Sequence, residues 1–87
     1  MHEFTMAVLV KNKYGVLNRV TSMFRRRRFN IRSLSVSETE TDEYSRITVT
    51  SYGSDTEKRQ LADQLCKLED VCFVRELADK ESVGFEL

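Results

Sequence analysis

The chain reads Asn12-Lys13-Tyr14-Gly15-Val16-Leu17 where an apolar run ends, and Phe29-Asn30-Ile31 one helix length later. The apolar run, Phe4 to Val10, predicts a strand, and Val16 to about Arg27 predicts an amphipathic helix. Gly15 is therefore expected where a strand turns into a helix. The first N–H groups of a helix lack intrahelical partners and carry the positive end of its dipole, so this turn suits a carboxylate or a phosphate. A glycine there lets a ligand approach the backbone closely.

Three further strands are expected. They cover Ile31 to Ser37, Tyr44 to Tyr52 and Val71 to Leu77, because these runs are rich in β-branched residues or alternate between apolar and polar side chains. The polar residues Glu38 to Glu43 predict a hairpin loop between the second and third strands.

A second helix is expected after the third strand. Ser54 followed by Glu57 has the form of a capping box, and Leu61, Leu65 and Leu68 follow at helical spacing. The resulting order, βαββαβ, predicts an α+β, ferredoxin-like fold. Right-handed crossovers then place both helices on one face of a four-stranded antiparallel sheet, with the second and fourth strands at its edges.

Length and charge restrict the possible partners. A chain of 87 residues makes one small domain with a modest core, for which a dimer is a natural expectation. Lysine and arginine number 14, as do aspartate and glutamate, and a net charge of zero argues against nucleic acid or an anionic membrane as partner. The sequence shows no secretory signal and no apolar run of about 20 residues, so we expect a cytoplasmic protein.

The residue inventory predicts no catalytic residue, no metal site and no cofactor of its own. Acidic residues, Asp70 among them, fall in the hairpin loop or on helix faces, where exposure to solvent explains them. Cys66 and Cys72 are expected to be buried or half-buried thiols, and His2 a mobile N-terminal residue.

The run Arg25-Arg26-Arg27-Arg28 has three interpretations. It ends the first helix, where cations complement the dipole, and this is the favoured interpretation. An RNA-binding platform needs stacking aromatics on the central strands, whereas the third strand offers Arg46, Thr48 and Thr50. The third interpretation is that the run docks an acidic surface of a larger protein, and it stays open.

Asn12 and Asn30 stand at opposite ends of the first helix. Turn chemistry alone explains an asparagine at either position. Together with Gly15 they also fit a small zwitterion, whose carboxylate meets the N–H groups of Gly15, Val16 and Leu17 and whose ammonium meets an asparagine oxygen. The pattern leaves both interpretations open.

Five motifs stand in a fixed order between about Thr5 and Leu77. They are Asn12-x-x-Gly15-Val16-Leu17-x-Arg19-Val20, Phe24, Phe29-Asn30-Ile31-x-Ser33-Leu34-x-Val36, Ser45-Arg46-Ile47-Thr48 and Gln64-Leu65-x-Lys67-Leu68-x-Asp70-Val71. In this order they resemble the ACT domain of acetolactate synthase small (regulatory) subunits. The resemblance implies an ACT domain over residues 1–78 followed by a polar tail, 79–87.

The resemblance also implies a mode of action. Such domains form homodimers through the second strand and bind a valine-like branched-chain amino acid at the dimer interface. The turn of one chain (Asn12, Gly15, Val16 and Leu17) then faces Asn30 and Ile31 of the other. The catalytic subunit of acetolactate synthase is the implied partner, and it holds the thiamin diphosphate. Alternatives are an amino-acid sensor or assembly module for another enzyme, and a small RNA-binding module.

One residue departs from the family pattern. Arg28 stands where the family usually has glycine, just before Phe29-Asn30-Ile31. A left-handed position at a helix C-terminus costs a non-glycine residue on the order of 1 kcal/mol, so we expect the turn to differ in shape from that of the family.

Overall fold

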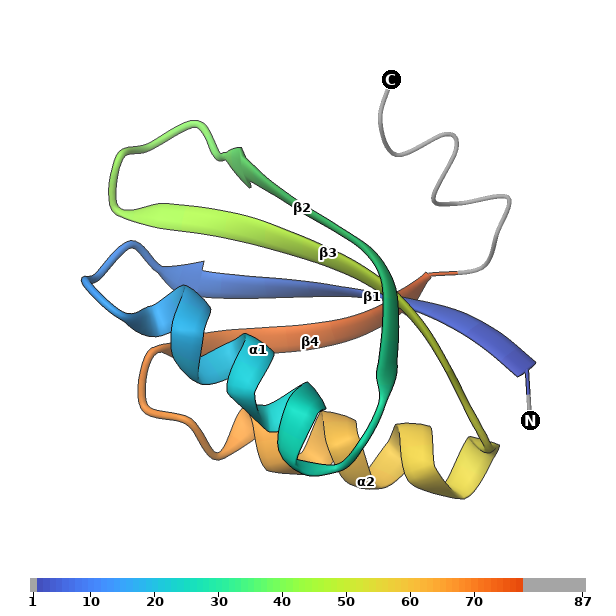
Figure 1. Cartoon of the computed structure of the whole chain (residues 1–87). Helices are drawn as coiled ribbons and strands as arrows, with labels where there is room; N and C mark the ends of the chain where they lie inside the picture. Colours follow the sequence, from blue (N-terminus) through green and yellow to red (C-terminus); the bar gives the residue numbers. More distant parts are fainter. Residues whose placement is uncertain (1, 78–87) are drawn as a thin grey trace.

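The computed structural model describes residues 2–77 and confirms the predicted order of elements (Figure 1). The strands are β1 (His2–Lys11), β2 (Asn30–Glu38), β3 (Tyr44–Gly53) and β4 (Val71–Leu77), and the helices are α1 (Val16–Arg26) and α2 (Asp55–Cys66). The sheet order is β2-β3-β1-β4 with antiparallel neighbours, so β2 and β4 are the edges. Both helices cover one face (Figure 1). The predicted boundary at residue 78 and the tail 79–87 lie outside the described residues.

The core lies between the helices and one face of the sheet. Its buried members are Phe4, Met6, Val8, Val10, Val16, Val20, Phe24, Ile47, Val49, Leu61, Leu65 and Val71. Alternate residues of β1 point into this core, and Thr5 and Ala7 on the other face of β1 are also only 5% and 6% exposed. Burial on both faces explains why β1 reads as an almost continuous apolar run.

The face of the sheet away from the helices carries a row of polar side chains on β3 and β2. Arg46, Thr48 and Thr50 of β3 lie there, and their partners in β2 are serines. Thr50 Oγ1 lies 3.0 Å from Thr5 Oγ1, within hydrogen-bonding distance. This row therefore consists of polar side chains that can bond to one another, and it carries no aromatic rings on which bases stack.

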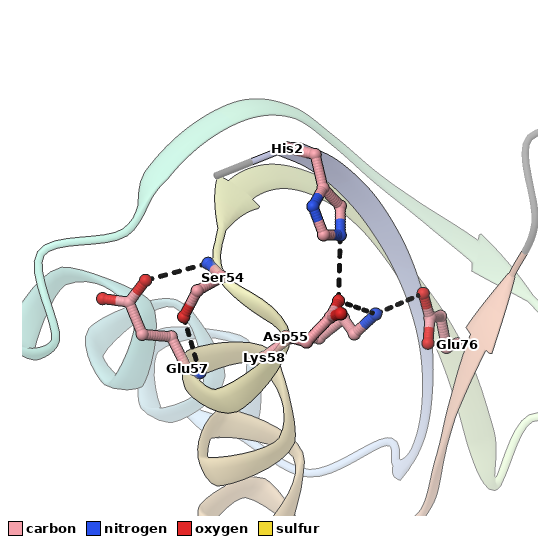
Figure 2. A network of polar contacts seen from close by, with 6 residues as sticks. All are labelled: His2, Ser54, Asp55, Glu57, Lys58 and Glu76. Atoms are coloured by element: carbon pink, nitrogen blue, oxygen red, sulfur yellow. Dashed lines mark hydrogen bonds and ion pairs between the residues drawn. The ribbon is translucent and has the colours of Figure 1, made fainter.

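Helix α2 begins with the predicted capping box (Figure 2). The N–H of Glu57 donates to Ser54 Oγ over 3.1 Å, and the N–H of Ser54 donates to Glu57 Oε1 over 2.9 Å. The bond from the backbone N–H of Ser54 holds the pKa of Glu57 below its ordinary value, because it favours the charged carboxylate.

A second network beside this cap ties α2 to both β1 and β4 (Figure 2). Lys58 Nζ lies 3.3 Å from Asp55 Oδ1 and 2.8 Å from Glu76 Oε2, and His2 Nε2 lies 3.0 Å from Asp55 Oδ1. His2 is thus a residue of β1 with a partner, and the expectation that it is mobile was wrong. The cause is a long-range strand pairing. The end of β3 lies beside the start of β1, and this places Asp55 next to His2.

The charges of this network depend on one another. The hydrogen bond from Lys58 holds the pKa of Asp55 below 3.8, and the hydrogen bond to Glu76 holds the pKa of Lys58 above 10.5. The contribution of Asp55 to stability is present above its ordinary pKa and lost as pH falls through the lowered value. The contribution of Lys58 is present below its ordinary pKa and lost as pH rises through the raised value.

Both cysteines are exposed, so the expectation of buried or half-buried thiols was wrong. Cys66 is the last residue of α2 and follows the buried Leu65, so it faces away from the core. Cys72 falls where the register of β4 against β1 shifts, on an edge strand.

Helix α1 ends in a Schellman motif. The N–H of Phe29 donates to the carbonyl of Phe24, the N–H of Arg28 donates to the carbonyl of Arg25, and the rings of Phe24 and Phe29 lie 6.0 Å apart. This motif requires a left-handed residue, and Arg28 supplies it with a φ of 61°. The turn thus keeps a left-handed residue although glycine is replaced, and the expectation of a different shape found no support in this backbone angle.

We predict that Arg28→Gly raises the free energy of unfolding by about 1 kcal/mol, because glycine adopts a positive φ without a steric penalty. The matched control is Arg27→Gly, where φ is −91°. It is expected to lower stability by up to about 1 kcal/mol, since glycine there only adds freedom to the unfolded chain. Urea denaturation at one protein concentration measures both, and a loss of stability in Arg28→Gly would contradict the prediction.

Candidate functional site

The turn between β1 and α1 is built around Gly15. This residue is the N-cap of α1 with a φ of 84°, and it makes no side-chain cap. A Cβ at this position would meet only Arg19 Nη1, at 3.8 Å. Glycine is thus required here by the backbone conformation, while the space above it is open to a ligand.

Three backbone donors at this turn are available. Within residues 2–77, the N–H groups of Gly15, Leu17 and Asn18 have no hydrogen-bond partner, whereas the N–H of Val16 donates to the carbonyl of Lys13 over 3.2 Å. Two of the three donors named from the sequence are therefore available, and Asn18 joins them. The first turn of α1 carries no acidic residue, so no side chain there offsets the positive end of the dipole.

Asn12 connects this turn to the hairpin loop between β2 and β3. Its side-chain Nδ2 donates to the carbonyl of Asp42 over 3.2 Å, and its N–H donates to the carbonyl of Glu43 over 2.8 Å. Turn chemistry thus accounts for the amide nitrogen of Asn12, and within the described chain the amide oxygen accepts no hydrogen bond. A cavity of ≈ 400 Å³ opens beside it, lined by Lys11, Asn12, Lys13, Glu43 and Tyr44.

Asp70 is a buried partner of charged residues in this turn and in α1. It is only 5% exposed, its carboxylate pairs with Arg19 of α1, and Lys13 Nζ lies 3.6 Å from its Oδ1. Its carbonyl also accepts the N–H of Lys11 over 2.8 Å. The expectation that Asp70 is solvated was wrong, because the connection from α2 to β4 runs against the end of β1. The sequence carried a signal in the Leu68-x-Asp70-Val71 motif.

Asn30 and Ile31 lie at the other end of α1. Asn30 is exposed at the start of β2, its carbonyl accepts from Ser51 Oγ, and its side chain has no partner in the described residues. Ile31 packs against the core. The 11 residues of α1 separate Asn30 from Gly15 by about 16 Å at 1.5 Å per residue. One copy of the chain therefore brings Asn12, Gly15, Val16 and Leu17 together but does not bring Asn30 and Ile31 to them.

The edge strand β2 exposes apolar side chains beside these groups. Leu34 and Val36 are 37% and 48% exposed, and they point to the helix side because their partners in β3 are the core residues Val49 and Ile47. Leu17, on α1, is 38% exposed. Leu34 and Val36 therefore form an apolar margin along β2 that is exposed in one copy.

A larger cavity, of ≈ 720 Å³, lies elsewhere and contains none of the predicted site residues. It is lined by Leu9, Glu38, Thr39, Glu40, Thr41, Tyr44, Arg46 and Phe73. Over residues 2–77, no group of three or more histidine, cysteine, aspartate or glutamate side chains is placed to hold a metal ion. None of the described helices is long and apolar enough to cross a membrane.

Comparisons with known proteins show the family of the chain. Residues 6–72 match the family model of the AHAS small subunit-like ACT domain. Over 95% of its length the chain is 49% identical to "Probable acetolactate synthase small subunit" of Archaeoglobus fulgidus, covering 52% of that protein, and 46% identical to an acetolactate synthase small subunit of Mycobacterium bovis, covering 49% of it. The chain thus spans about half the length of the curated relatives it matches.

Solved structures give the same result. The acetolactate synthase small subunit from Thermotoga maritima superposes with a TM-score of 0.82 at 37% identity, over 91% of this chain and 49% of that one. The ACT domain of a GTP pyrophosphokinase from Chlorobium tepidum superposes with a TM-score of 0.74 at 22% identity, over 87% of this chain and 97% of that one. The second similarity shows the fold alone.

We predict that Asp70→Asn lowers the free energy of unfolding by about 2 kcal/mol, because it leaves Arg19 and Lys13 without their buried counter-charge. Asp63→Asn, on the exposed face of α2, is the matched control and is expected to change stability by less than about 0.5 kcal/mol. Arg19→Met combined with Asp70→Asn should cost less than the sum of the single changes. Additive costs in urea denaturation would show that Arg19 and Asp70 do not interact.

Proposed function

The chain belongs to the family of AHAS small subunit-like ACT domains, and on that premise we propose that it is the non-catalytic regulatory subunit of an acetolactate synthase in branched-chain amino-acid biosynthesis. The similarity to small subunits along almost the whole chain carries this proposal. The partner subunit holds the thiamin diphosphate and performs the chemistry, while this chain binds a branched-chain amino acid such as valine.

The site for that amino acid is completed by a second copy. The N–H groups of Gly15 and Leu17 bind the carboxylate at the positive end of α1. The Asn30 side chain of the other copy supplies an oxygen for the ammonium. Both charges of a zwitterion are then met by neutral groups, which fits a site in which Asp70 already occupies the nearby cations.

Pairing of two copies through β2 brings the Gly15 turn of one copy close to Asn30 of the other. The outer backbone groups of an edge strand are unpaired, and Leu34 and Val36 add apolar area that pairing would cover. Two β2 strands related by a two-fold axis run antiparallel, so the start of one lies beside the end of the other. Because the Gly15 turn is bonded to the hairpin loop at the end of β2, Asn30 of the other copy arrives beside it.

We predict that calorimetry detects binding of valine, leucine or isoleucine and that Gly15→Asp abolishes it, since a fixed negative charge repels the carboxylate. Gly15→Asn is the matched control: it has nearly the same shape and backbone strain without the charge, and it should retain more affinity. Asn30→Ala should weaken binding by roughly 1.5–3 kcal/mol, the range for a hydrogen bond to a charged group. Equal affinity in the wild type and Gly15→Asp would place the site elsewhere.

We predict that the chain co-elutes with an acetolactate synthase catalytic subunit from the same source and changes its rate of acetolactate synthesis. Mixing the two purified proteins, with and without valine, tests the partner and the effector separately. Co-elution with an altered rate but no response to any branched-chain amino acid would make the chain an assembly module. Neither co-elution nor a change in rate would favour a sensor for another enzyme.

A further inference from the structure

Opposite charges flank the edge strand β2. Four arginines, Arg25 to Arg28, end α1 and its cap just before the strand, and we name them the arginine cluster. Four acids, Glu38, Glu40, Asp42 and Glu43, end the strand and fill the hairpin loop after it, and we name them the acidic loop. The chain has no net charge, yet these two groups are each of a single sign.

Neither group is neutralised within one copy. All eight side chains are exposed, and none of them forms an ion pair within residues 2–77. Arg25 donates only to Ser22 Oγ, over 3.0 Å. The nine residues of β2 hold the two groups about 30 Å apart at 3.3 Å per residue, well beyond the screening length of about 8 Å at physiological salt.

We propose that two copies of this chain are held in register by ion pairs between the arginine cluster of one copy and the acidic loop of the other. The pairing is formed twice, because a two-fold axis through the middle of β2 exchanges the two ends of the strand. Each cluster of four positive charges then lies beside a loop of four negative charges. This inference rests on the proposed dimer through β2.

The position of the arginines supports a role beyond the helix end. The helix dipole accounts for Arg25 and Arg26, which lie in the last turn of α1, but its effect fades beyond that turn. Arg27 is the C-cap, and Arg28 lies past it at a φ of 61°. The helix dipole therefore does not account for the charge of Arg28.

The proposed contact between the arginine cluster and the acidic loop lies beside the proposed amino-acid site. The carbonyls of Asp42 and Glu43 in the acidic loop are the groups that hold Asn12. An arginine cluster that docks on this loop therefore orders the backbone beside the Gly15 turn. Asn30 lies two residues after Arg28, so docking of the arginine cluster also brings Asn30 to the Gly15 turn of the other copy.

The test exchanges the charges. Arg26→Glu with Arg27→Glu leaves the arginine cluster with no net charge and sets two glutamates against the acidic loop of the other copy. Glu40→Lys with Asp42→Lys leaves the loop with no net charge and sets two lysines against the arginine cluster. Each double variant alone should dimerise at least about tenfold more weakly than wild type in sedimentation experiments in about 50 mM NaCl, and much of the difference should vanish in about 500 mM NaCl. Mixed together, the two variants form a heterodimer in which one contact has the wild-type charges and the other sets the two new glutamates against the two new lysines. Native mass spectrometry should therefore find heterodimers well above the statistical half.

Matched controls place equal charge changes on the other helix. Arg59→Glu with Lys67→Glu, and Asp63→Lys with Glu69→Lys, alter exposed residues on or next to α2 and should leave dimerisation within about twofold of wild type. Ser35→Pro, in the middle of β2, removes a backbone donor and reports on strand pairing itself.

The outcomes separate the two proposals. A dimer that Ser35→Pro disrupts but the charge variants do not would overturn the ion-pair register and keep the β2 dimer. A monomeric wild type at every concentration would overturn both, while binding of the catalytic subunit would still be tested on its own. Unchanged dimers with loss of binding to that subunit, or to poly(U) RNA, in Arg26→Glu with Arg27→Glu would also overturn the proposal and assign the cluster to that partner.

Discussion

The edge strand β2 is the constraint on which the rest of this molecule depends. Its apolar residues Leu34 and Val36 are exposed on the helix side, although they pair with core residues of β3. The other edge, β4, differs because α2 packs against it and Lys58 bonds Glu76. The features that lack partners in one copy gather at the two ends of β2: the arginine cluster and Asn30 before it, the acidic loop and the turn bonded to that loop after it. Every copy therefore carries both the groups that make each proposed contact and the groups that receive it, at opposite ends of β2.

The Gly15 turn shows how a small domain can offer an anion site without a free charged side chain. Its two nearest cations, Arg19 and Lys13, are paired with Asp70, which is buried. What remains is a set of backbone N–H groups at the start of α1, fixed by a glycine with a positive φ. Such donors match a single carboxylate and do not attract polyanions strongly, so the proposed preference for an amino acid over RNA follows from the same geometry.

Local patterns predict most of this fold, and long-range pairings account for what they miss. The strands, the helices and the capping box depend on neighbours in sequence, and their patterns were sufficient. Asp70 was misjudged because Arg19, its partner, is 51 residues away. His2 was misjudged for the same reason, since Asp55 reaches it only once β3 lies beside β1. Of the proposed site residues, Asn12 and Gly15 lie in one turn of a single chain, whereas Asn30 reaches them only in the proposed dimer.

In the proposed dimer, the amino acid and the second copy act on the same equilibrium. A ligand that contacts Gly15 of one copy and Asn30 of the other binds only the paired state, so it strengthens pairing by its own binding energy. By thermodynamic linkage, anything that strengthens pairing raises the affinity for the ligand by the same factor. The ion pairs at the ends of β2 are exposed and sensitive to salt, whereas Leu34 and Val36 contribute an apolar term that salt does not screen. Salt should therefore lower affinity for the amino acid through the dimer, even though the ligand itself carries no net charge.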